Sequence, residues 1–118
     1  CAALGIADAD VVVDCMAMTV GTDHTAALVT LETIRCVRET FGVNVVLGAS
    51  NISFGMPDRA LLNAAFIAQA IAAGATCLIA DTATVRACVL AADVLQGRDE
   101  YSARYLSAYR QRQRMRTA

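Results

Sequence analysis

The sequence predicts an α/β protein built from three consecutive β/α units with parallel strands. Three short apolar runs recur along the chain, at residues 11–13, 43–47 and 77–79, and each precedes a segment with apolar residues at helical spacing. Asp14, Gly48 and Asp81 occupy equivalent places at the ends of these runs, 34 and 33 residues apart. Strands and helices that alternate at this period form parallel sheets with right-handed helical crossovers.

Each element has its own local justification. The strand runs are continuously apolar rather than alternating, which is typical of strands buried on both faces. Helices are predicted over residues 25–41, from Pro57 or Asp58 to 73, and over residues 84–96, each with a glycine directly after it. Proline at the start of the second helix suits a first helical turn.

The composition indicates one apolar core. Of the 118 residues, 57% are hydrophobic and 18% are charged, which excludes a disordered chain. No apolar run approaches the roughly 18 residues of a membrane span, and no segment resembles a targeting peptide, so a soluble protein is expected. The five cysteines form no CxxC pair and no metal-ligand spacing, so we expect buried, reduced thiols, no metal site and a cytoplasmic location.

Residues 99–118 differ from the rest of the chain. Three tyrosines stand four residues apart and are followed by four alternating arginines. This pattern predicts a terminal helix whose tyrosines cover the body and whose arginines face water. Tyrosines and arginines also stack on bases, but a net charge of −1 and the lack of another basic face argue against a nucleic-acid partner.

The most informative segment is residues 48–59, which follow a buried strand and open a helix. Gly48 allows a ligand to approach the backbone, Ser50 and Asn51 offer a hydroxyl and a carboxamide, and the next helix supplies free amide donors. Spacing alone predicts a polar ligand pocket or, equally, a turn capped by Ser or Asn. His24 beside Asp23 suggests acid–base chemistry, although a single loop histidine is more often a cap or a surface residue.

The run LGASNISFGMPDRALLNAAFIAQAIAAGATCLIAD resembles the seventh strand, seventh helix and eighth strand of the pterin-binding methyltransferases. The upstream VVVDCMAMTVGTD resembles their sixth strand and its loop, and AADVLQGRDEYSARYLSAYR resembles their closing helix. The resemblance implies a (β/α)8 TIM barrel of the dihydropteroate-synthase-like type. Residues 1–118 then form the C-terminal portion of one barrel domain, strands six to eight, and residues 99–118 form a terminal helix and basic tail. Eight such units need roughly 250 residues, so the chain supplies less than half of the domain.

This resemblance also implies a reaction. The family moves the N5 methyl group of 5-methyltetrahydrofolate to the cobalt of a corrinoid (cobalamin), which a partner protein or domain carries. By residue matching, Asn51 is the expected catalytic residue, because it hydrogen-bonds N5 as that nitrogen gains positive charge. Asp14 is expected to bind the pterin ring. The expected substrate-binding set is Asp14, Gly48, Ser50, Asn51, Arg59 and Asp81, with a structural hydrogen bond as an equal alternative for Asp81.

The sequence departs from the family pattern at two positions. Cys15 stands where proline is frequent, and Phe54 stands where some relatives have glutamine, which favours the branch similar to methionine synthase. Dihydropteroate synthases have Ser-Arg-Lys in place of Ser50-Asn51-Ile52, which argues against condensation chemistry.

Alternative functions stay open. One is another pterin enzyme of the same fold, and the other is a non-catalytic α/β assembly module whose exposed edges pair with a second copy. A homo-oligomer is expected, and the chain alone is expected to be inactive, because the family also uses the ends of the third and fourth strands.

Overall fold

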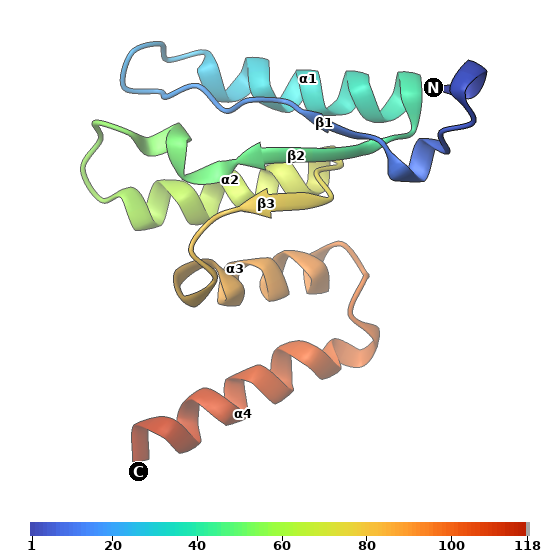
Figure 1. Cartoon of the computed structure of the whole chain (residues 1–118). Helices are drawn as coiled ribbons and strands as arrows, with labels where there is room; N and C mark the ends of the chain where they lie inside the picture. The colour runs from blue at the N-terminus through green and yellow to red at the C-terminus, as the bar shows by residue number, and fades with distance from the viewer. Residues whose placement is uncertain (118) are drawn as a thin grey trace.

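A computed structural model of the chain describes residues 1–117. Three parallel strands lie side by side in the order β1-β2-β3, and each leads into a helix (Figure 1). The strands are β1 (Val12–Asp14), β2 (Asn44–Gly48) and β3 (Cys77–Ile79), and the helices are α1 (Ala26–Phe41), α2 (Arg59–Ala73), α3 (Thr82–Leu95) and α4 (Ala103–Thr117). Short 3-10 turns are η1 (Ala2–Leu4), η2 (Asp8–Asp10), η3 (Ala49–Ser53) and η4 (Glu100–Ser102). The predicted class and element order are confirmed.

The register places the carboxyl ends of the three strands along one edge of the sheet. Asp14 lies opposite Val46, and Gly48 lies opposite Ile79. The loops after the strands therefore emerge on one side, where binding sites of parallel α/β sheets form.

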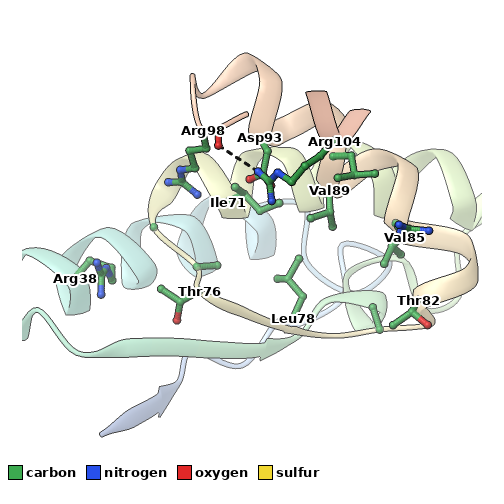
Figure 2. A pocket seen from close by; sticks show the side chains of 15 residues that line it. Arg38, Ile71, Thr76, Leu78, Thr82, Val85, Val89, Asp93, Arg98 and Arg104 are labelled. Carbon is green, nitrogen blue, oxygen red and sulfur yellow. Dashed lines mark hydrogen bonds and ion pairs between the residues drawn. The ribbon is translucent and has the colours of Figure 1, made fainter. Parts of the chain in front are cut away.

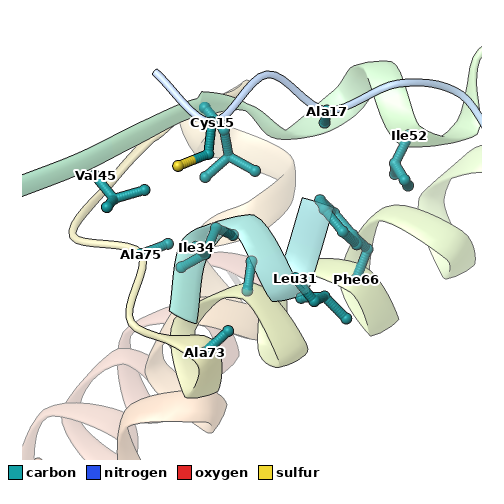
Figure 3. Packing of buried hydrophobic residues seen from close by; sticks show 11 residues of the cluster. Cys15, Ala17, Leu31, Ile34, Val45, Ile52, Phe66, Ala73 and Ala75 are labelled. Atoms are coloured by element: carbon teal, nitrogen blue, oxygen red, sulfur yellow. The ribbon is translucent and has the colours of Figure 1, made fainter. Parts of the chain in front are cut away.

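Only one face of the sheet is covered. Val45 and Leu47 point to the helices, are fully buried and pack against α1 and α2, and Val13 and Leu78 pack partly buried against the same cluster. Figure 3 shows this cluster, which draws Ile34 from α1 and Phe66 from α2. On the opposite face, Val12 is 55% exposed. The prediction of strands buried on both faces is therefore wrong for this chain, because α1, α2 and α3 all cover one face only.

The boundaries of α1, α2 and α3 agree with the prediction to within two residues, but Pro57 does not form a first helical turn. This proline lies in the turn before α2, and the helix begins at Arg59, with Asp58 in the left-handed region at φ 47°. Gly42 and Gly74 end α1 and α2 in left-handed conformations, as predicted. At Gly74 the added constraint is close packing, since a Cβ there would lie 2.7 Å from the side chain of Arg38.

The terminal helix α4 forms as predicted, but the three tyrosines of residues 99–118, of which Tyr101 precedes α4 in η4, do not all cover the body. Tyr101 is 90% exposed and Tyr109 is 48% exposed, and only Tyr105 is half-buried. Ala108 is the buried residue of α4. The expectation fails because α4 lies along the outside of α3, at the margin of the molecule (Figure 1), so that only a narrow stripe of it meets protein.

The prediction that the cysteines are buried is wrong for most of them. Cys15 is buried and Cys88 half-buried, whereas Cys1, Cys36 and Cys77 are exposed. Cys77 lies on the open face of the sheet and Cys36 on the outer side of α1, two surfaces that this chain does not cover. Within residues 1–117, no helix combines the length and apolar character needed to cross a membrane.

Candidate functional site

The loops after β1 and β2 are joined to each other at the carboxyl edge of the sheet. The Thr19 hydroxyl donates to the Phe54 carbonyl at 2.6 Å, and the Val20 amide donates to the Ile52 carbonyl at 2.9 Å. The Asn51 carboxamide donates through Nδ2 to the carbonyl of Ala17. The Asn51 side chain is therefore tied to the loop that follows Asp14, 34 residues earlier at Ala17.

Gly21 makes this close approach possible. A Cβ built at this position would lie 2.8 Å from the Phe54 carbonyl oxygen and 3.3 Å from the Thr19 hydroxyl. Both neighbours belong to the network that joins the loops, and a backbone oxygen has little freedom to move aside. Residues 19 and 21 position the site, and sequence reasoning missed them because only the folded loops bring them against Phe54.

Asp14 ends β1 with its side chain exposed on the open face of the sheet. Its Oδ1 accepts from the Met16 amide at 2.9 Å, which holds a turn in which Met16 has φ 38°. That backbone region is sparsely populated by residues other than glycine. Within residues 1–117, Oδ2 has no hydrogen-bond donor, so the carboxylate keeps acceptor capacity toward the open face.

The segment after β2 forms the 3-10 turn η3, and it does not adopt the simple side-chain-capped turn that was the alternative prediction. Asn51 is exposed, and because Nδ2 is engaged with Ala17, its Oδ1 is left to accept a hydrogen bond. Gly48 has open space where a Cβ would stand, with no atom within 4 Å. A planar ligand therefore has room to approach the backbone of β2 beside Asn51.

Ser50 and Arg59 are in contact, in an arrangement that stabilises η3. The Arg59 guanidinium donates to the Ser50 carbonyl at 2.9 Å and to the Ser53 hydroxyl at 3.0 Å. It also lies 6.0 Å from the centre of the Phe54 ring, within cation–π range. Ser53, which is fully buried, is a further positioning residue that sequence reasoning missed.

Asp81 caps α3. Its carboxylate accepts from the Ala83 amide at 3.0 Å, which is the structural hydrogen bond foreseen as the alternative to ligand contact.

A cavity of about 340 Å³ separates the first turns of α2 and α3, and its lining includes Ser50, Arg59 and Thr84. The side-chain oxygen of Asn63, another lining residue, is buried and has no hydrogen-bond partner among residues 1–117.

Other polar groups near this edge have local roles. Asp23 accepts from the amide and the hydroxyl of Thr25, and these hydrogen bonds hold the pKa of its carboxyl below the usual value. His24 is exposed, as expected for a surface residue. Burial, followed by the charge of Asp14, raises the pKa of the Cys15 thiol, so it stays protonated. Residues 1–117 contain no cluster of three or more metal-ligating side chains.

Comparison with known proteins agrees with this geometry. A methylcorrinoid:tetrahydrofolate methyltransferase from Eubacterium limosum is 29% identical over 102 residues, which cover 84% of this chain and 38% of the relative. The chain thus spans about 38% of the length of that curated relative. Residues 1–81, which include β1, β2, β3 and the loops of the site, match the sequence model described as "Pterin binding enzyme". Three parallel β/α units with a polar carboxyl edge are consistent with part of the barrel of such enzymes, and the chain belongs to the pterin-binding enzyme family.

Proposed function

We propose that this chain supplies the last three β/α units of a barrel that transfers a methyl group between tetrahydrofolate and a corrinoid. The observation that carries the proposal is the joined pair of loops that present Asn51 and Asp14 beside the open position at Gly48. Family membership supports a pterin ligand, and the relative's name supports methyl transfer that involves a corrinoid and tetrahydrofolate.

Asn51 is the proposed catalytic residue. N5 of the pterin leaves poorly as an anion, so a hydrogen bond that strengthens as N5 gains a proton favours the transition state over the ground state. The bond from Nδ2 to Ala17 fixes the carboxamide, which leaves Oδ1 to accept from protonated N5. The fixed amide needs little reorganisation during the reaction.

Asp14 is the proposed pterin anchor. A carboxylate accepts from a ring N–H and an exocyclic amine together, and such charge-assisted bonds are the stronger kind. The Met16 amide holds Oδ1, which leaves Oδ2 to accept from the pterin. Gly48 and the backbone of Ser50 line the same edge of the sheet. We propose that Arg59 affects the ligand indirectly, because it holds the Ser50 carbonyl and the shape of η3.

We propose that the methyl-accepting group reaches the site at the carboxyl ends of the strands. A corrinoid held by its carrier supplies a cobalt centre, and we propose that its carrier docks over the carboxyl ends of the strands. The name of the E. limosum relative gives methylcorrinoid first and tetrahydrofolate second. The same site serves either direction, since a catalyst does not move the equilibrium. The remaining barrel wall comes from further β/α units.

Replacement of Asn51 tests the proposal in the intact enzyme. We expect Asn51→Ala to slow single-turnover methyl transfer by roughly a hundredfold or more, with a smaller change in methyltetrahydrofolate affinity by calorimetry. Asn44→Ala is a matched control, because Asn44 also donates through Nδ2 to a loop carbonyl, that of Ala9 at 2.8 Å, but at the amino end of β2. A wild-type rate in Asn51→Ala, or equal losses in both variants, would exclude the catalytic role.

A further inference from the structure

Phe54 is an exposed aromatic residue to which the proposed reaction assigns no role. Its side chain is 63% exposed, and it stands at one of the two positions where the sequence departs from the family pattern. Phe54 belongs to the loop after β2, the central strand of the three, so the β/α units on both sides of this loop are present on the chain (Figure 1). Its exposure therefore differs from that of the two lateral edges of the sheet.

A cavity beside β3 illustrates the difference. It measures about 770 Å³ and lies between β3 and α3, with Leu78, Val85 and Val89 among its lining residues (Figure 2). Because β3 is an edge strand, a further β/α unit would cover this cavity under the proposed function. The apolar surface beside β3 is thus explained by the fold, whereas the exposed ring of Phe54 is not.

The backbone of Phe54 is fixed at both ends. Its amide donates to the Asn51 carbonyl at 3.0 Å, and its carbonyl accepts from the Thr19 hydroxyl at 2.6 Å. Both bonds use backbone groups, so the ring itself is not needed to join the loops. A ring that projects from a fixed backbone loses little conformational entropy when a ligand packs against it.

Phe54 stands on the same side of η3 as Asn51. Side chains three residues apart in a 3-10 turn are eclipsed and lie about 6 Å apart along its axis. Asn51 and Phe54, which closes η3, are three residues apart and both exposed, whereas Ile52 and Ser53 between them are buried. The ring therefore lies one turn beyond the proposed position of N5.

Arg59 adds a positive charge beside the ring. Its guanidinium carbon lies 6.0 Å from the ring centre, and Nε and Nη2 donate to Ser53 and Ser50. Within residues 1–117, Nη1 donates no hydrogen bond, so part of the guanidinium remains available to an anion. An aromatic ring with a cation beside it favours a ligand in which an aromatic ring is followed by a carboxylate.

We propose that Phe54 stacks against the aminobenzoyl ring of tetrahydrofolate, and that Arg59 attracts the glutamate carboxylates that follow this ring. The inference rests on the proposed function. The tail of tetrahydrofolate is attached to C6, the atom next to N5, so a pterin that meets Asn51 through N5 begins its tail within reach of Phe54. Phe54 then sets how strongly the site prefers a folate over a pterin that has no tail.

The test compares two methyl donors in the intact enzyme that contains this chain. One is 5-methyltetrahydrofolate, and the other is 5,6-dimethyltetrahydropterin, which has no tail; calorimetry measures the affinity for each. We expect the wild type to prefer the folate. Phe54→Ala should weaken folate binding by roughly tenfold and binding of the tail-less donor by less than roughly twofold. Phe54→Tyr should retain the preference, because it keeps the aromatic face.

Leu61→Ala is the matched control. Leu61 is 65% exposed on the first turn of α2, so it is an apolar side chain of similar exposure near Phe54 in the sequence. Its replacement should leave both affinities unchanged, and circular dichroism verifies that each variant is folded. Loss of folate preference in Leu61→Ala would contradict a specific role of the Phe54 ring.

Other outcomes separate this inference from the proposed function. A wild type that binds both donors equally, or equal losses of both donors in Phe54→Ala, would exclude the tail contact and leave pterin binding intact. Unchanged affinities in Phe54→Ala would also exclude it, and a raised KM for the corrinoid carrier would then assign Phe54 to the carrier interface. A wild type that binds neither donor would exclude the proposed function and this inference with it.

Discussion

The two faces of the β-sheet carry similar residues in very different surroundings. Leu47 and Val45 face the helices and are fully buried, whereas Ile79 and Val12 face away from them and are 63% and 55% exposed. One face holds the chain together, and the other presents Asp14 and the open position at Gly48. Under the proposed function, the uncovered face is apolar because it belongs to a barrel interior that further β/α units complete.

The two faces should differ most in how much their side chains contribute to the free energy of unfolding. Leu47→Ala removes a fully buried side chain, and we expect it to lower the free energy of unfolding by about 2–5 kcal/mol. Ile79→Ala on the open face should change it by about 0.5 kcal/mol or less. Urea denaturation at one protein concentration measures both. Similar losses in the two variants would mean that the open face is covered in solution.

Gly21 and Gly48 separate two roles, because Gly21 lets the loops of the site pack together and Gly48 leaves room for the pterin. Gly21→Ala places a methyl group 2.8 Å from the Phe54 carbonyl, and we expect it to cost about 1–3 kcal/mol in unfolding free energy. Gly48→Ala meets no atom within 4 Å, so stability should stay within about 0.5 kcal/mol. In the intact enzyme, Gly48→Ala should instead weaken methyltetrahydrofolate binding, measured by calorimetry. Unchanged affinity would place the pterin elsewhere.

Chemical modification of two cysteines compares the same two faces of the sheet without any substitution. Cys15 points to the helices and is 6% exposed, and burial raises the pKa of its thiol. Cys77 lies on the open face and is exposed. We expect iodoacetamide to modify Cys77 at least roughly tenfold faster than Cys15, by peptide mass spectrometry, because Cys15 must wait for local opening. Equal rates in the native chain would contradict the burial of Cys15.

The sequence predicted the elements well because their signals are local. Apolar runs, helical spacing and terminal glycines located β1, β2, β3 and the three helices between and after them. The burial of each face could not be predicted, since a continuous apolar run is the same whether or not a neighbour covers it. Phe41 and Leu95 likewise fit the helical spacing of α1 and α3 but are 61% and 82% exposed.

The candidate site was only partly predictable. Asp14, Gly48 and Asn51 are predicted site residues because they match the family motif, and the structure places them at or just after the carboxyl ends of β1 and β2. The roles of Thr19, Gly21 and Ser53 depend on contacts between loops more than 30 residues apart or on a buried hydroxyl, which no local pattern signals. The structural hydrogen bonds of Arg59 likewise became visible only in the folded loop.

The smallest expected effect is a pH-dependent change in local stability at the start of α4, away from both faces of the sheet. The Asp99 carboxylate accepts from the amides of Arg104 at 3.0 Å and Tyr105 at 2.9 Å. Burial by itself raises the pKa of Asp99, but these hydrogen bonds and the charge of Arg104 outweigh burial and hold the pKa below the usual value of an aspartate. A lowered pKa in the folded state stabilises the helix start above the unfolded value, and this stabilisation is lost as pH falls through the folded pKa.

Amide hydrogen exchange at Arg104 and Tyr105 measures this loss. Protection of these two amides should be constant from neutral pH to about pH 4 and should fall below it, after correction for the intrinsic exchange rate. Asp99→Asn keeps an acceptor without the charge, so it should lower protection at neutral pH and remove the pH dependence. Asp58→Asn is the control, because the Asp58 side chain makes no capping bond to α2. If the Asp99→Asn variant still lost amide protection as pH falls, a carboxyl group other than that of Asp99 would control the start of α4.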